Sequence, residues 1–152
     1  MRILDPYAPH ATYKKIIQKY GGEYSFFEKL RMGGVGSPRV SYQSGIPEFD
    51  VVHHSDDLEQ SMTNFELVKK GLIIRINKKQ NLAVAIEHLE LLKSVTLTSN
   101  KATTTERTGK VGTLWLEFQN YEPLYFKVGK EEYKGVQRFF EKSVFAKVYQ
   151  GA

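Results

Sequence analysis

The sequence predicts an α+β domain. In it a curled antiparallel sheet, or partly open barrel, is capped by a C-terminal helix and preceded by a short helical extension. Two observations carry this prediction. Between residues 65 and 128 apolar and polar residues alternate in short runs separated by polar breaks, which is typical of antiparallel hairpins. After residue 130 apolar residues recur every three or four positions, as in a helix with one apolar face. Because an apolar sheet face must be covered, we expect this helix to pack on the sheet.

The strand block starts at Phe65 and continues through further alternating runs. Gly71 favours a turn after the first run, because glycine adopts backbone geometries that other residues resist. Residues 77–81 form a polar break of hairpin length, a bend is expected near Glu87, and residues 99–112 form an exposed loop. The expected strands are residues 65–67, 72–76, 82–86, 91–98, 113–119 and 124–128.

The closing helix is expected from residue 130 to about residue 147. Two glutamates lie in its first turn and two lysines near its end, where they complement the helix dipole. Its apolar stripe consists of Tyr133, Val136, Phe140 and Val144, and Phe139 widens it.

From Phe65 the chain reads Phe-Glu-Leu-Val-Lys-Lys-Gly-Leu-Ile-Ile-Arg-Ile-Asn, and alternating runs follow at residues 82–86 and 92–97. This order, with the final hairpin and the helix that carries residues 135–140, resembles a bacterial pleckstrin-homology-like (PH-like) domain over about residues 63–149. The resemblance implies a PH-like domain at residues 63–152 and an extension at residues 1–62. It also implies seven strands, and the missing one is expected from Val51 and Val52 or from a split of residues 82–98.

The composition limits the class of protein. With 152 residues, 41% of them hydrophobic and 12% aromatic, the chain is expected to form one folded domain. It has no cysteine, which excludes disulfides and thiolate metal sites. We see neither a signal-peptide core nor a run of membrane-spanning length and expect a soluble, cytoplasmic protein. The net charge of +5 favours anionic partners without requiring them.

The N-terminal third is expected to hold two short helices, at residues 11–20 and 25–32. A glycine pair at residues 21–22 ends the first, and a capping-box spacing begins the second. Such short helices need a surface to pack on. We expect the outward-facing Trp115 and Tyr125 to provide it, with a dimer or ligand contact at these two side chains as the alternative.

Residues 33–62 are rich in glycine and proline and are interpreted as a long loop or linker. Residues 40–42 and 49–52 are its candidate strands. A phosphate-loop interpretation of residues 33–39 is rejected, because the segment lacks the Gly-Lys-Ser/Thr ending and proline stands where a helix should start.

A basic cluster surrounds the first hairpin. Its members are Lys69, Lys70, Arg75, Lys78 and Lys79, and Lys101, Arg107 and Lys110 could extend it. The resemblance implies that basic residues around this hairpin bind headgroup phosphates through charge-assisted hydrogen bonds. The two lysine pairs, however, lie in successive turns at opposite ends of a strand, about 20 Å apart and too far for one headgroup. The alternative is a solvated edge that discourages strand-to-strand aggregation.

The richest cluster of metal-ligand types is His53, His54, Asp56 and Asp57. Imidazole and carboxylate groups could hold a divalent ion. Neighbouring histidines on an extended chain point to opposite faces, so a polar loop with a short capped turn is the alternative.

No nucleophile elbow or metalloprotease helix is present, and the predicted core leaves little room for a substrate. The sequence therefore predicts a non-enzymatic binding module without a cofactor, whose partner is a protein or an anionic surface. Two alternatives stay open: a weak phosphoinositide or anionic-membrane binder through residues 69–79, and a metal-assisted hydrolase centred on His53 and Asp56. Nucleic-acid binding is not favoured, because no strand face interleaves aromatic and basic residues. The oligomeric state is left open.

Overall fold

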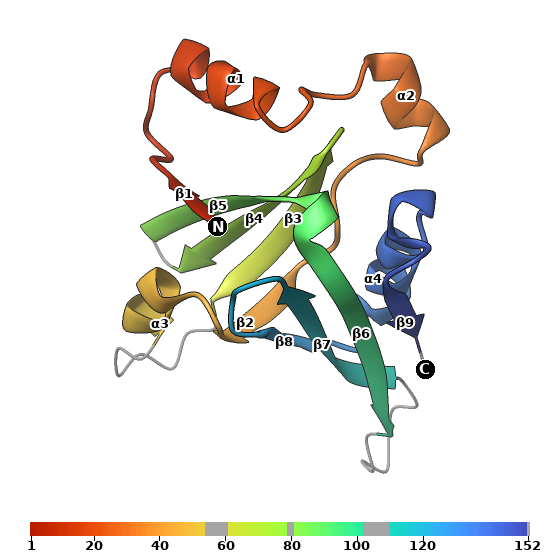
Figure 1. Ribbon diagram of the computed structural model, residues 1–152. Helices are drawn as coiled ribbons and strands as arrows, with labels where there is room; N and C mark the ends of the chain where they lie inside the picture. Colours follow the sequence, from red (N-terminus) through yellow and green to blue (C-terminus); the bar gives the residue numbers. More distant parts are fainter. Residues whose placement is uncertain (54–60, 79–80, 102–109, 152) are drawn as a thin grey trace.

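The computed structural model describes residues 1–53, 61–78, 81–101 and 110–151 (Figure 1). Its strands are β1 (Arg2–Leu4), β2 (Val40–Ser44), β3 (Met62–Val68), β4 (Gly71–Lys78), β5 (Asn81–His88), β6 (Leu92–Lys101), β7 (Lys110–Phe118), β8 (Leu124–Val128) and β9 (Tyr149–Gly151). Its helices are α1 (His10–Gln18), α2 (Phe26–Arg31), α3 (Pro47–His53) and α4 (Tyr133–Phe140), with 3-10 turns at Leu89–Leu91 and Ser143–Phe145. The expected α+β class with a C-terminal helix is confirmed.

The strands form one sheet in the order β1-β5-β4-β3-β2-β8-β7-β6-β9. All neighbours are antiparallel except β6 and β9, which run parallel. The sheet does not close, because β1 and β9 are its two edges. β2 comes from the segment expected as an extension, yet it lies in the middle of the sheet, where Val40 pairs with Thr63 and Tyr42 pairs with Phe126.

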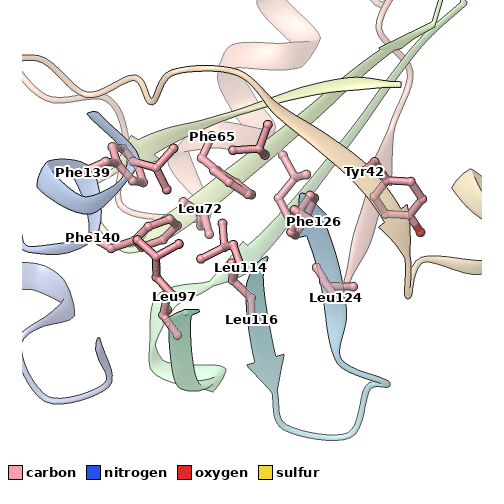
Figure 2. Packing of buried hydrophobic residues seen from close by; sticks show 14 of the residues in the cluster. Tyr42, Phe65, Leu72, Leu97, Leu114, Leu116, Leu124, Phe126, Phe139 and Phe140 are labelled. Carbon is pink, nitrogen blue, oxygen red and sulfur yellow. The ribbon is translucent and has the colours of Figure 1, made fainter. Parts of the chain in front are cut away.

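One face of the sheet encloses the main core (Figure 2). The expected alternation holds in β8, where Leu124, Phe126 and Val128 are buried and the two residues between them are exposed. Phe65 of β3 lies 5.2 Å from Phe126 of β8 and 5.6 Å from Phe140 of α4, measured between ring centroids. Side chains from both halves of the sheet and from α4 therefore meet in a single cluster.

The C-terminal helix is shorter than expected. α4 ends at Phe140, and Lys142 has extended backbone angles (φ −58°, ψ 149°) that break the helix. Because the chain turns there, Val144 is 39% exposed and does not join the apolar stripe, whereas Phe145 is fully buried. The chain then adds β9 beside β6, with Tyr149 opposite Val95. The expectation of one helix to about residue 147 is wrong in this respect.

Helix α1 covers the outer face of β3, β4 and β5. Its Ile17 packs in a second apolar cluster with Val68, Ile73 and Ile86. This explains why Ile73, which points away from the main core, is only 1% exposed. The expectation that Trp115 and Tyr125 provide the surface on which this helix packs is wrong.

Trp115 of β7 instead lies beside Tyr125 of β8, with 6.5 Å between ring centroids. Tyr125 is 42% exposed. Both stay predicted interface residues on the outer face of the sheet. No helix in the described residues is long and apolar enough to cross a membrane.

Residues 49–52, a candidate strand, belong to α3 instead. The helix is tied to β2 by the buried Tyr42, whose hydroxyl accepts a hydrogen bond from the Ile46 amide (2.7 Å) and donates one to Asp50 Oδ1 (2.5 Å). Burial, and then the hydrogen bond to Asp50, raise the pKa of the Tyr42 hydroxyl far above its ordinary value. Neither source expected for a seventh strand supplies one, because Val51 and Val52 lie in α3 and residues 82–98 form only β5 and β6, which were already expected. The additional strand is β2, which contains the candidate strand at residues 40–42.

Candidate anion-binding site

The site begins at the C-terminal end of α1, where two glycines reverse the chain. Gly21 and Gly22 have φ of +87° and +79°, a region that other residues adopt at a cost. The Gly22 amide donates to the Ile17 carbonyl at 3.1 Å, which closes the helix. A Cβ on Gly21 would lie 3.0 Å from side-chain atoms of Lys69 and Lys70, so the β3–β4 turn approaches this loop closely.

Backbone hydrogen bonds fix the β3–β4 turn on that loop. The Lys69 amide donates to the Gly22 carbonyl (3.0 Å), and the Lys70 amide donates to the Tyr20 carbonyl (2.8 Å). The Lys70 carbonyl accepts from the Leu89 amide at 3.0 Å. The turn is thus held from both sides, and its two lysine side chains, both exposed, start from a rigid backbone.

His88, the last residue of β5, closes the other side of the site. Its ring stacks on Tyr20 with centroids 4.3 Å apart and an angle of 29° between the planes. Burial raises the pKa of the Tyr20 hydroxyl, and the Glu87 carboxylate adds to the increase. Glu87 itself is buried and forms an ion pair with the Met1 amino group at 2.8 Å.

Between these elements lies a cleft of about 510 Å³, which we call the lysine cleft. It is lined by Lys19, Lys69, Lys70, His88, Leu89, Glu90 and Val144. Three lysines and one glutamate are therefore among the lining residues, and Leu89 and Val144 are the apolar ones. A concave surface with this excess of one charge raises the local concentration of counter-ions.

The cations of the lysine cleft are largely uncompensated. The Lys69 ammonium lies 4.0 Å from Glu28 Oε1, and both side chains are more than 40% exposed, so this pair is weak. Among the residues that the structure describes, no ion pair involves Lys19 or Lys70. The cleft can therefore offer hydrogen-bond donors and positive charge to an anion without first breaking a strong ion pair.

The predicted basic cluster does not form one site. Lys69 and Lys70 line the lysine cleft, but Arg75 lies further along β4 and forms an ion pair with Glu66. Arg75 Nη2 also donates to the Tyr13 hydroxyl at 3.0 Å, which ties α1 to the sheet. Lys78 ends β4 at the strand end away from the cleft, and Lys79 is not among the described residues.

Sequence reasoning missed two members of the site. Lys19 lies in the last turn of the expected first helix (residues 11–20), and His88 follows Glu87 at the expected bend. The available signal for Lys19 was a lysine two residues before a glycine pair that ends a helix. No local pattern shows that the end of α1 docks against the β3–β4 turn, because the two are about fifty residues apart in the chain.

The predicted metal cluster is largely outside the described residues. His54, Asp56 and Asp57 are among those left undescribed, as is the side chain of His53 at the end of α3. Across the described ranges, no group of three His, Cys, Asp or Glu side chains could hold a metal ion. Arg107 and the side chains of Lys101 and Lys110 are likewise not described.

A second cleft, of about 400 Å³, is lined by residues of β2, β3, β6, β7 and β8 and of the segment that leads to α4. Its charged lining residues are Arg39, Lys127 and Glu132, beside apolar residues such as Val40 and Val128. This mixed lining favours no single ligand charge as strongly as the lysine cleft does.

Comparison with known proteins gives no family for the chain: no protein-family model and no curated protein sequence matches it. The lysine cleft is therefore the feature of the molecule that bears on its function. Fold alone would not supply it, because one fold can host many unrelated functions.

Proposed function

We propose that the protein is a non-enzymatic binding module with a PH-like fold that holds a phosphate-bearing anion in the lysine cleft. The observation that carries the proposal is the convergence of Lys19, Lys69 and Lys70 on one cleft from two elements far apart in sequence. An ammonium group binds phosphate as a compact point charge with three donors. The backbone of all three lysines is held by hydrogen bonds, so their ammonium groups can recognise a phosphate by its negative charge.

The strand arrangement supports the PH-like part of the proposal. Seven consecutive strands, β2 to β8, are followed by α4. The resemblance implies seven strands and a closing helix, and β2 supplies one of the seven from outside residues 63–152, the range that the resemblance covers. In the sheet, β2 pairs with both β3 and β8, so these seven strands are contiguous.

The size and lining of the lysine cleft favour a small phosphorylated group. A volume of about 510 Å³ falls within the usual range of ligand pockets. Glu90 lies in the lining and would repel an anion on its side, whereas the three lysines attract one on theirs. A ligand with phosphate at one end and an uncharged body toward Leu89 and Val144 fits this division.

Titration of ¹⁵N-labelled protein with pyrophosphate, followed by amide chemical shifts, tests the proposal. We expect shifts concentrated at residues 69–71 and 88–90. The variant with Lys19→Gln, Lys69→Gln and Lys70→Gln should bind at least about tenfold more weakly, since each charge-assisted contact contributes about 1.5–3 kcal/mol.

The matched control removes the same charge elsewhere, through Lys127→Gln, Lys130→Gln and Lys134→Gln. All three positions are exposed: Lys127 lies in β8, Lys134 lies in α4 and Lys130 lies between these two elements. It should keep the wild-type affinity. Equal losses in both variants, or shifts spread over the whole surface, would show nonspecific charge attraction and refute the site.

A further inference from the structure

The second cleft carries charges of both signs that do not pair with each other. Arg39 and Lys127 contribute two cations to its lining, and Glu132 contributes a carboxylate. Across the described ranges of the chain, none of these three side chains takes part in an ion pair. The opposite charges are therefore too far apart to neutralise each other. A ligand that carries both charges would bridge them, because complementary charges favour one ligand over its competitors.

The register of the sheet places the cationic side of the second cleft. Ser41 of β2 lies opposite Lys127 of β8, and Lys127 lies opposite Thr113 of β7. These three strands are neighbours in the sheet (Figure 1), and side chains of opposed residues project from the same face. The Ser41 hydroxyl accepts from Gln43 Nε2 at 3.3 Å and keeps its own proton to donate. Together with Arg39, which directly precedes β2, this side offers hydrogen-bond donors and positive charge to a carboxylate.

Gly129 leaves the room that the carboxylate occupies. Glu132 is half-buried just before α4, and a Cβ on Gly129 would collide with its Oε2. Any other residue at position 129 would therefore displace this carboxylate. The start of α4 is itself packed on β7, because a Cβ on Gly112 would lie 2.7 Å from a ring carbon of Tyr133. Both glycines line the second cleft, so the carboxylate has a defined place in its wall.

Apolar side chains make up another part of the lining. Met62 and Val111 are half-buried and so still offer surface to a ligand, beside the buried Val40 and Val128. The volume of about 400 Å³ falls within the usual range of small-molecule sites. Such sites are mostly apolar and use a few polar groups to fix the orientation of the ligand. A short aliphatic group therefore fits beside the charged groups.

We propose that the second cleft binds a small zwitterion with an aliphatic body, which is the chemistry of an aliphatic α-amino acid. Arg39 and Lys127 hold the carboxylate of the ligand, and Glu132 holds its ammonium group. Met62 and Val111 contact the aliphatic body. A molecule with only one of the two charges would leave one side of the cleft without a partner. The second cleft shares no lining residue with the lysine cleft, so this inference does not depend on the proposed function.

Titration of ¹⁵N-labelled protein with L-leucine, followed by amide chemical shifts, tests the inference. We expect shifts concentrated at residues 39–41, 111–113 and 127–132. Isocaproate lacks the ammonium group of leucine and isoamylamine lacks its carboxylate. Each should bind at least about tenfold more weakly than leucine, because a lost charge-assisted hydrogen bond is worth at least that factor. Absence of shifts at about 20 mM leucine, or equal affinity for leucine and either analogue, would overturn the inference.

Two single variants assign the two ends of the ligand. Glu132→Gln should weaken leucine binding at least about tenfold without weakening isocaproate binding, because isocaproate has no ammonium group to lose a partner. Lys127→Gln should weaken leucine and isocaproate binding and leave isoamylamine binding unchanged. Each variant thus keeps one ligand, which shows that it folds.

The matched controls are Glu131→Gln and Lys130→Gln, since both positions are exposed and neither side chain lines the second cleft. Both should bind leucine like the wild type. A loss in the controls equal to that in the cleft variants would show nonspecific charge attraction and refute the site. Unchanged leucine binding by Glu132→Gln and Lys127→Gln would also refute it, and either result would leave the proposed function of the lysine cleft standing.

Discussion

At the residue scale, the Tyr42 hydroxyl connects β2 to α3. We expect Tyr42→Phe to lower the free energy of unfolding by about 1–3 kcal/mol, because the Ile46 amide and the Asp50 carboxylate each lose a hydrogen-bond partner in a buried place. Urea denaturation followed by circular dichroism measures the change. Tyr7→Phe, at a side chain that is 77% exposed, should leave stability unchanged. Equal stability of both variants would show that the Tyr42 network contributes nothing.

Gly21 is the residue on which the geometry of the lysine cleft depends most. Gly21→Ala combines a left-handed backbone angle with a close approach to Lys69 and Lys70, so it should displace the β3–β4 turn. We expect a loss of more than about 1 kcal/mol in unfolding free energy and weaker pyrophosphate binding.

Gly33→Ala separates the effect of the left-handed backbone angle from the effect of the close approach to the β3–β4 turn. Gly33 also has positive φ (+73°), but a Cβ there would meet no atom within 4 Å. This variant should show the backbone cost alone and keep its pyrophosphate affinity. Identical binding by the two variants would mean that the turn does not depend on its contact with Gly21.

At the scale of the element, α4 is the cover of the main core. Phe140 is fully buried and its ring lies near those of Phe65, Phe139 and Phe145. We expect Phe140→Ala to lower the unfolding free energy by about 3–5 kcal/mol, through lost burial and the cavity left behind. Thermal and urea denaturation measure this, with Lys134→Ala on the exposed face of the same helix as a control that should change stability by less than about 0.5 kcal/mol. A loss under about 1 kcal/mol for the phenylalanine variant would contradict the role of α4.

Local pattern predicted most elements of the sheet. The alternation in residues 72–76 and 124–128 predicted two strands, because neighbouring side chains on a strand point to opposite faces. The same approach failed after Phe140. Val144 fits the helical spacing, but tertiary packing favours burial of Phe145 instead, and no local signal distinguishes these two residues.

At the scale of the whole molecule, the parts that sequence could not predict are long-range contacts. The position of β2 between β3 and β8 joins residues that are more than eighty positions apart. The lysine cleft arises in the same way, from the docking of α1 on the β3–β4 turn. Lys69 and Lys70 were predicted from local charge, whereas Lys19 and His88 join them only through the fold.

The central claim is that these lysines recognise anionic charge at one place. Isothermal titration with pyrophosphate between about 50 and 500 mM NaCl measures it most directly, because attraction between exposed charges is screened by salt. The wild-type Kd should rise steeply with salt, and the variant with glutamine at positions 19, 69 and 70 should bind weakly with little dependence on salt. A variant that matched the wild type in both Kd and salt dependence would contradict the account.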